Sequence, residues 1–348
     1  MKFDFSLSNN IDRTKWVSKI GKTAKEPWEK EIVMFLSDWF SEKDEFEIKT
    51  SGTTGPVKTE IYSRSSLIAS ANITIATFSL TPGDTLLMCL PTKFVAGKMM
   101  LVRAIAGKMK LLALKPKSNP IENLDKVIDF AAFTPHQMQH IIQESSEMLN
   151  LIKKVIIGGS PVNDSLKKQL LLLNPVFYET YGMSETLTHI AIRPLHDSGE
   201  LELFTVLKGF KIKVDKESRL VIDAKHLHNC PIVTADMVEI MEQNKFKWLG
   251  RADDVINSGG VKLFPALIEK KLSRIINRNF IITKQNDSDL GEVVVLIIEG
   301  DPISNDSLEL LKTAFIKSLD KYEIPRKINY TVEFPRNNNG KIIRSGIK

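Results

Sequence analysis

Cysteine is scarce in this sequence, and its pattern excludes a cysteine-based metal site. The two cysteines, Cys89 and Cys230, lie in apolar, strand-like contexts without metal-ligand spacing, a setting typical of small buried side chains. Long apolar runs are also missing. None approaches the roughly 18 residues that a membrane span requires, and residues 1–20 lack the apolar core of a signal peptide. We therefore expect a cytoplasmic protein without a membrane span.

Charge of one sign is not concentrated anywhere in the chain. The 48 Lys and Arg residues are scattered among 42 Asp and Glu residues, which leaves a formal net charge of +6 without a basic tract. This distribution argues against nucleic-acid binding and indicates a solvated surface that favours anionic small molecules. The composition, 43% hydrophobic and 26% charged, is typical of a globular protein. A chain of 348 residues exceeds a comfortable single core, so we expect two or three subdomains.

Predicted strands and helices alternate after residue 58, which favours a mostly parallel sheet with helices on its faces. The expected strands are Thr85–Leu90, Lys110–Leu114, Phe130–Phe133 and Lys154–Ile157, and the expected helices lie near 65–79, 97–107, 135–146 and 163–172. Residues 201–240 change to short strands with charged turns, which fits a small antiparallel sheet or barrel. Ahead of this core, apolar side chains at helical spacing from Trp28 to Trp39 predict a helix behind Pro27.

A second unit is expected beyond Arg251. The sequence predicts a helix at 265–276, an apolar strand at 292–298, a helix at 308–319 and a strand near 327–332. We place the boundary at Ala252–Asp253, so that residues 1–251 form an N-terminal domain and residues 252–348 a C-terminal domain. The expected fold class is α/β, with a layered, mostly parallel core, a small antiparallel β subdomain and an α+β C-terminal domain.

A loop of small residues closed by a lysine precedes this core. Its glycines, hydroxyls and lysine suit phosphate oxygens, because the backbone N–H groups can approach closely and the lysine neutralises charge. A surface turn is the plain alternative. A P-loop fits less well, because Val57 stands where the second glycine belongs and the next residues read as a strand. The candidate phosphate-binding residues are Thr50, Ser51, Gly52, Thr53, Thr54, Gly55 and Lys58.

Further segments follow along the chain, and each has a structural alternative. Residues 157–161 read Ile-Gly-Gly-Ser-Pro, a plausible strand-to-helix turn. Residues 178–186 read Tyr-Glu-Thr-Tyr-Gly-Met-Ser-Glu-Thr, in which an acid alone would be a surface residue. Residues 250–262 read Gly-Arg-Ala-Asp-Asp-Val-Ile-Asn-Ser-Gly-Gly-Val-Lys, and residues 335–344 read Pro-Arg-Asn-Asn-Asn-Gly-Lys-Ile-Ile-Arg. A lysine in such a terminal segment is normally solvated.

Taken in order, these segments resemble the motifs of the adenylate-forming superfamily, which comprises acyl-CoA synthetases, luciferases and peptide-synthetase adenylation domains. The loop at 50–58 resembles T-S-G-T-T-G-x-P-K, residues 178–186 resemble Y-G-x-T-E, and residues 250–262 resemble G-R-x-D-D-x-I-x-S-G-G-x-K. The matching segments span residues 50 to 344. The resemblance implies an adenylate-forming fold that is shortened at its N-terminus, with a mobile C-terminal lid.

The resemblance also implies roles for individual residues. ATP is expected to bind the loop at 50–58 and the residues Gly158, Gly159, Ser160, Glu179, Thr180, Tyr181, Gly182, Met183, Ser184, Asp236 and Arg251. Glu185 is expected to bind Mg²⁺, since hard cations prefer carboxylate oxygens. Lys341 is the expected catalytic lysine of adenylation. Coenzyme A is expected at Gly259, Gly260 and Lys262, and Asp253 is the expected hinge.

The implied reaction has two halves. A carboxylic acid is first converted by ATP to an acyl adenylate with release of pyrophosphate, and the thiol of coenzyme A then displaces AMP. The resemblance implies that the lid turns about Asp253 between the halves, withdrawing Lys341 and presenting Gly259 and Gly260.

The identity of the carboxylic acid substrate is suggested by Arg103, a lone arginine in an apolar helix. The plain alternative is an arginine that snorkels or pairs with a protein carboxylate. Residues 90–103 resemble the 2-succinylbenzoate–CoA ligases of menaquinone biosynthesis, in which an arginine pairs with the second carboxylate of the substrate. Phe94 departs from the histidine common there, and His136 is a weak candidate. We expect 2-succinylbenzoate as the acid. There are two alternatives within the superfamily: the acid could be another aryl or acyl acid, or the acceptor could be a carrier protein in place of coenzyme A. A P-loop hydrolase is a distant third alternative.

Overall fold

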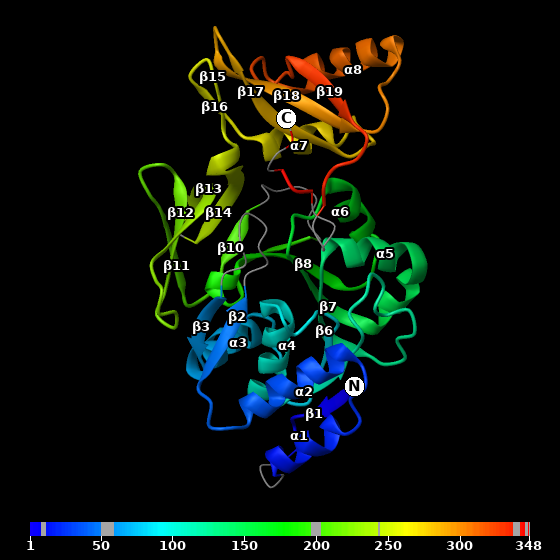
Figure 1. Ribbon diagram of the computed structural model, residues 1–348, viewed down its shortest axis with the longest axis vertical. Helices are drawn as coiled ribbons and strands as arrows, with labels where there is room; N and C mark the ends of the chain where they lie inside the picture. The colour runs from blue at the N-terminus through cyan, green and yellow to red at the C-terminus, as the bar shows by residue number, and fades with distance from the viewer. Residues whose placement is uncertain are drawn as a thin grey trace. The chain divides into compact units, whose positions relative to one another are not determined.

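The structure is a computed structural model that describes residues 1–7, 12–49, 59–195, 203–242, 244–336, 342–344 and 347. It divides into two compact units, each of which is discontinuous in sequence (Figure 1). The first contains Met1–Lys211 and Ile222–Ile232, and the second contains Ile212–Val221 and Val233–Lys348. The predicted boundary at Ala252–Asp253 therefore lies inside the second unit.

The first unit contains a mixed sheet whose centre is parallel, as the sequence predicts. Its strand order is β1-β5-β4-β6-β7-β8-β9-β10. Strands β4, β5, β6, β7 and β8 pair in parallel, whereas β1, β9 and β10 join antiparallel. The strands are β1 Lys2–Asp4, β4 Thr85–Met88, β5 Lys110–Ala113, β6 Ile128–Phe133, β7 Ile152–Ile157, β8 Val176–Gly182, β9 His189–Pro194 and β10 Phe204–Val206.

Helices α4 Val95–Ala106, α5 Pro135–Ser145 and α6 Asp164–Leu170 connect parallel strands, and α3 Arg64–Thr77 precedes the first of these strands, all at the predicted places. Helix α2 Pro27–Trp39 was also predicted, whereas α1 Arg13–Gly21 was not. Helix α5 begins where the sequence demands it, because Thr134 and Gln137 form a reciprocal capping box and Pro135 occupies the first turn. Met138 and Ile141 of α5 pack in one core with Leu87, Ile128 and Val155 of the sheet. Burial of this apolar surface fixes the helix against the strands.

Of two paired N-terminal strands, the second follows the strand predicted after Val57, whereas the first was not anticipated. Strands β2, Glu45–Lys49, and β3, Thr59–Ser63, form an antiparallel hairpin in which Lys49 lies opposite Thr59. Side chains of β2 alternate between buried and exposed, the pattern of a strand with one covered face. The hairpin therefore brackets residues 50–58, which lie outside the described residues.

The second unit contains the C-terminal sheet of five strands, with the order β16-β15-β18-β17 and with β19 parallel to β18. Its core joins the sheet to α7 and α8 through Leu296, Ile268 and Phe315. Helix α7 ends at Leu272, earlier than predicted. The elements are β15 Ile256–Ser258, β16 Val261–Leu263, α7 Pro265–Leu272, β17 Phe280–Asp287, β18 Gly291–Glu299, α8 Asn305–Ser318 and β19 Lys327–Thr331.

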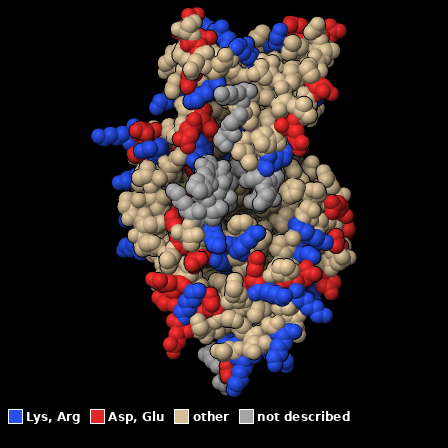
Figure 2. All heavy atoms as spheres, in the orientation of Figure 1, with Lys and Arg blue, Asp and Glu red and all other residues tan. Residues whose placement is uncertain are grey.

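Four further strands, β11 Phe210–Val214, β12 Arg219–Ala224, β13 Ile232–Glu242 and β14 Lys245–Arg251, are neighbours in the order β14-β13-β12-β11. Strands β13 and β14 pair antiparallel, in agreement with the predicted character of this region. On the face drawn in Figure 2, Lys and Arg side chains are interspersed with Asp and Glu. No helix among the described residues is long and apolar enough to span a membrane.

Candidate active site

The first group of predicted site residues lies where β6, β7 and β8 end. Gly158 follows β7, and its N–H donates to the carbonyl of Phe133 at 3.1 Å. A Cβ on Gly158 would lie 2.4 Å from Oγ1 of Thr180 on β8, so no larger residue fits without a shift. Gly159 has a φ of +91°. The sequence therefore places a tight, glycine-dependent turn at the carboxyl edge of parallel strands, the usual position of a ligand in such sheets.

The second group continues from the end of β8. A Cβ on Gly182 would lie 2.5 Å from the carbonyl oxygen of Thr188, so Gly182 allows β8 and the start of β9 to approach closely. The pairing of β8 with β9 is irregular at this point. Ser184 to Thr186 form a short 3₁₀ turn, which places Glu185 beside the ends of the parallel strands.

Glu185 has a half-buried side chain whose carboxylate makes no hydrogen bond or ion pair with any residue that the structure describes. Its backbone carbonyl is held instead, because the hydroxyl of Tyr62 on β3 donates to it at 2.8 Å. Within the described ranges, no three His, Cys, Asp or Glu side chains gather as a complete metal site. One free carboxylate fits Mg²⁺, which is usually held by one or two carboxylates together with substrate phosphates.

Glu179 occupies a different environment. Its side chain is buried, and one carboxylate oxygen accepts hydrogen bonds from Nε of Arg193 at 2.8 Å and from Nη2 at 2.6 Å. The other oxygen accepts the N–H of Val162 at 3.1 Å. The carboxylate therefore ties β8 to β9 and to the segment after Ser160.

Arg103 lies in α4, as predicted, with 3% of its surface exposed. Its Nη2 donates to Oγ1 of Thr188 at 2.6 Å, whereas its Nε is buried and has no hydrogen-bond partner in the described structure. No carboxylate of the described residues forms an ion pair with it. Burial lowers the pKa of the guanidinium to about 10, so it still carries its charge at neutral pH.

The other residues near the predicted acid site are less informative. Phe94 precedes α4 as its N-cap residue and is half-buried. His136 is exposed, and its ring lies against that of His140 with the centroids 4.6 Å apart. Thr188 and His189 were missed by the sequence analysis. No motif marks them, and only the fold brings them to Arg103.

In the second unit, Asp236 and Arg251 lie opposite each other in the β13–β14 pair. Nε1 of Trp248 donates to Oδ1 of Asp236 at 3.1 Å, and the N–H of Asp236 donates to Oγ1 of Thr234 at the same distance. Nη2 of Arg251 lies 3.5 Å from Oδ2 of Asp253, whose side chain is largely exposed. These two predicted ATP-binding residues are therefore brought together.

Gly259 and Gly260 form the two-residue turn between β15 and β16. Their φ values are +56° and +82°, which glycine adopts without strain. A Cβ on Gly259 would lie 3.1 Å from the ring of Tyr322, whereas a Cβ on Gly260 would meet no atom within 4 Å. Lys262 on β16 is exposed. The turn thus presents bare backbone at Gly260, as a surface against which a thin ligand could lie.

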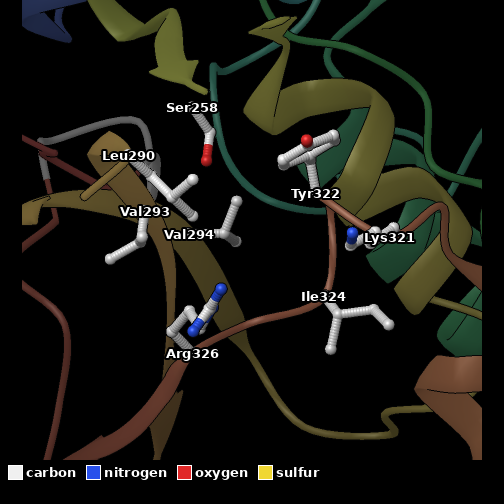
Figure 3. A pocket seen from close by; sticks show the side chains of 8 residues that line it. All are labelled: Ser258, Leu290, Val293, Val294, Lys321, Tyr322, Ile324 and Arg326. Carbon is white, nitrogen blue, oxygen red and sulfur yellow. The ribbon is translucent and has the colours of Figure 1, made fainter. Parts of the chain in front are cut away.

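A small pocket of about 120 Å³ lies beside this turn. In Figure 3 the hydroxyl of Ser258, the ring of Tyr322 and the guanidinium of Arg326 surround it. The remaining lining residues are Leu290, Val293, Val294, Lys321 and Ile324. Four of the eight lining side chains are aliphatic, and Lys321 and Arg326 add two cations. The predicted phosphate-loop residues Thr50, Ser51, Gly52, Thr53, Thr54, Gly55 and Lys58 and the predicted catalytic Lys341 lie outside the described residues.

Comparison with known proteins gives the family. Residues 46–226, more than half of the chain, match the family of AMP-binding enzymes. An acyl-CoA synthetase (AMP-forming)/AMP-acid ligase II-like protein from Dyadobacter fermentans is 32% identical. The alignment covers 99% of this chain and 97% of that one, with a TM-score of 0.66.

Curated relatives and further structures agree with this match. A probable 2-succinylbenzoate–CoA ligase from Mycobacterium tuberculosis is 26% identical, over 86% of this chain and 82% of the relative. The o-succinylbenzoate coenzyme A synthetase of Bacillus subtilis, solved with ATP and magnesium ion, shares the fold at 19% identity. That alignment covers 98% of this chain and 82% of the other, with a TM-score of 0.72. The chain belongs to the AMP-binding enzyme family, and its fold is that of the adenylate-forming enzymes.

Proposed function

We propose that the protein is an acid–CoA ligase that converts 2-succinylbenzoate to its coenzyme A thioester through an acyl adenylate, as a step of menaquinone biosynthesis. The observation that carries the choice of acid is Arg103, a buried guanidinium without a carboxylate partner in the described structure. Burying an unpaired charge costs several kcal/mol, and a second carboxylate on the substrate would offset that cost. A relative of 26% identity named as a probable ligase of this acid supports the proposal.

In the first unit, the residues proposed to bind the nucleotide are the glycine turn at Gly158–Ser160 and the end of β8 around Tyr181, and in the second unit they are Asp236 and Arg251. The chain's own contribution to Mg²⁺ binding would be the carboxylate of Glu185, held in place through the contact of its backbone with Tyr62. A bound Mg²⁺ would neutralise the phosphate charge of ATP. Among the predicted ATP residues, Glu179 would act through the backbone that it fixes, since both of its oxygens are engaged.

The thiol half of the reaction is assigned to the C-terminal part of the chain. We propose that residues 252–348 act as a lid that turns about Asp253, so that Lys341 serves the first half-reaction. Gly259, Gly260 and Lys262 would then face coenzyme A in the second. The bare backbone at Gly260 supports this role, because a side chain there would project into open space where the pantetheine arm is expected to lie.

The test is ATP–pyrophosphate exchange with a panel of mono- and dicarboxylic aromatic acids, followed by addition of coenzyme A. We expect exchange to be strongest with 2-succinylbenzoate, and a thioester to form with free coenzyme A. Equal exchange with 3-benzoylpropionate, which has the same skeleton without the ring carboxylate, would refute the choice of acid. Exchange without a thioester would point to a carrier protein as acceptor, and release of phosphate in place of pyrophosphate would refute adenylation.

A further inference from the structure

A chain of buried polar contacts leads from Arg103 to a histidine that no motif marks. Nη2 of Arg103 donates to Oγ1 of Thr188 at 2.6 Å, and the same oxygen lies 3.2 Å from Nδ1 of His189. On the far side of the imidazole, Nε2 lies 3.4 Å from Oγ1 of Thr74 on α3. All four side chains are buried. The contacts therefore form one line that is shielded from water.

The position of these residues follows from the irregular start of β9. Leu187 has a φ of +60°, and the register between β8 and β9 shifts next to Gly182. This geometry turns Thr188 and His189 toward α3 and α4 before regular pairing begins. The ring of Phe78 packs edge-on against His189 with the centroids 6.1 Å apart, so the imidazole is held by packing as well as by hydrogen bonds.

The charge of Arg103 decides the direction of the hydrogen bonds. A guanidinium can only donate, so Oγ1 of Thr188 accepts from Arg103 and keeps its own proton for another partner. The neighbouring atom available in the described structure is Nδ1 of His189. A lone pair on Nδ1 is favoured beside a cation, whereas a proton there would be repelled. Burial and the charge of Arg103 both hold the pKa of His189 well below its usual range, which keeps the ring neutral.

We propose that His189 is a positioning residue for the acid substrate, acting as the neutral Nε2–H tautomer. Its Nδ1 accepts the hydroxyl proton of Thr188, which turns an oxygen lone pair of Thr188 to Nη2 of Arg103. One corner of the guanidinium is thereby held, and its buried Nε–H has no hydrogen-bond partner in the described structure. A bidentate guanidinium–carboxylate contact depends strongly on the plane of the guanidinium, so the histidine would control affinity for an acid with a second carboxylate. This inference rests on the proposed function.

Three variants and one control test the proposal by kinetics. His189→Leu and Thr188→Val, the second nearly isosteric, should each raise the KM for 2-succinylbenzoate by about tenfold, as expected for a lost orienting hydrogen bond. The KM for ATP and the KM for 3-benzoylpropionate should stay within about twofold of wild type. His189→Gln should recover most of the loss, because its side-chain oxygen can also accept from Thr188. The control is Thr77→Val on α3, whose hydroxyl bonds to the carbonyl of Ile73 and which should change neither KM.

A measurement without turnover checks the tautomer. In protein labelled with ¹⁵N-histidine, the signal lost in His189→Gln should show an unprotonated Nδ1 and a protonated Nε2 near neutral pH. The opposite tautomer would overturn the proposal, as would equal losses for both acids in His189→Leu and Thr188→Val. If wild type treats the two acids alike, the proposed acid fails. If wild type discriminates and Arg103→Ala abolishes the discrimination while His189→Leu and Thr188→Val keep it, only the role of His189 fails.

Discussion

Glu179 and Arg193 lie directly opposite each other on the antiparallel strands β8 and β9, joined by two hydrogen bonds of 2.8 and 2.6 Å. Six residues further along, the carboxylate of Glu185 has no partner in the described structure. The two carboxylates, only six residues apart, therefore have different surroundings. Glu179 stabilises the strand pair, and Glu185 is left able to bind a cation.

Replacing Glu185 by Gln should raise the Mg²⁺ concentration needed for half-maximal pyrophosphate exchange. An amide keeps the shape but removes the charge that a hard cation requires. We expect a rise of at least about tenfold, with the free energy of unfolding changed by less than about 1 kcal/mol. A magnesium titration of the exchange rate measures the first quantity and urea unfolding the second.

The matched control is Glu179→Gln, the same chemical change within the same segment. Loss of one partner of a buried ion pair costs about 3–5 kcal/mol, so this variant should lose stability while its Mg²⁺ requirement stays unchanged. A reversal of the two results would exchange the roles of these acids.

Replacing Lys341 by Ala should slow adenylation on the order of 100-fold, the usual effect of removing one charged donor from a reacting phosphate. Thioester formation from pre-formed acyl adenylate should continue, because the lysine is proposed to act only in the first half-reaction. Pyrophosphate exchange and single-turnover thioester assays separate the halves. Lys312→Ala on α8, where the lysine pairs with Glu309, is the control and should alter neither. Equal slowing of both halves by Lys341→Ala would contradict the proposed lid motion.

Replacing Gly260 by Leu should spare pyrophosphate exchange and block thioester formation. A Cβ at this position meets no atom within 4 Å, so the new side chain would project into the proposed path of the thiol. The positive φ should cost about 1–2 kcal/mol of stability. Gly83→Leu is the control, since Gly83 has a φ of +90° and equally open surroundings. The Gly83→Leu variant should lose a similar amount of stability, but it should not affect thioester formation more than pyrophosphate exchange. Loss of exchange in Gly260→Leu would instead assign residues 258–262 to the nucleotide site.

Replacing Arg103 by Ala should lower kcat/KM for 2-succinylbenzoate. The corresponding loss of transition-state stabilisation should be about 2–4 kcal/mol, the usual cost of removing one partner of a desolvated charge pair. The KM for ATP should be nearly unchanged. The monocarboxylic 3-benzoylpropionate should show no comparable loss, so that the comparison becomes a double-mutant cycle with one partner on the ligand. Similar losses for the two acids would make the arginine a purely structural residue.

Replacing Arg344 by Ala should destabilise the second unit more as the pH rises. Glu269 of α7 accepts Nη2 of Arg344 on both oxygens, at 2.7 and 2.6 Å. Burial raises the pKa of Glu269 even with Arg344 present, and removing the cation should raise it further. A raised carboxyl pKa means that the folded state binds more protons than the unfolded state, so stability is lost as the pH rises above the unfolded value of 4.5.

We expect a loss of about 1–3 kcal/mol near neutral pH and a smaller loss near pH 5, measured by thermal unfolding at both. Arg336→Ala is the control. Its partner Glu299 is also partly desolvated, but hydrogen bonds from the N–H of Phe334, from Asn279 and from Arg336 hold its pKa low. Two of those donors remain in the variant, so its loss should vary less with pH. A pH-independent loss in Arg344→Ala would show that Glu269 ionises as easily as an exposed acid.

The sequence predicted those parts of the fold that rest on local pattern. Apolar runs identified four of the central strands. The helix expected near 135–146 is α5, whose first turn is capped locally by Thr134 and Gln137. Strand β2 was missed although its buried and exposed side chains alternate. It is only five residues long and its partner β3 begins ten positions later, so pairing and not local pattern defines it.

The candidate site likewise contains residues that local motifs predict and residues that only the fold brings together. Motifs identified Gly158, Glu185 and Arg103. The sequence could not tell that Glu179 forms an ion pair, whereas Arg103 has no carboxylate partner among the described residues. Partners of buried charges are set by strand register and helix packing, which join residues far apart in the chain. Thr188 and His189 escaped notice for the same reason, since 85 residues separate Arg103 from Thr188.

The outermost strand of the first unit bears on how the molecule avoids aggregation. Strand β1 is only three residues long and carries Lys2 and Asp4, and it pairs with β5 from Lys110 to Leu112. A short, charged edge is a poor template for another chain, whereas a long apolar edge invites one. Without β1, the backbone of β5 beside Leu111 and Leu112 would be open to pairing between molecules. Three residues at the margin of the sheet thus cover the backbone edge of β5, which would otherwise be open to pairing with another molecule.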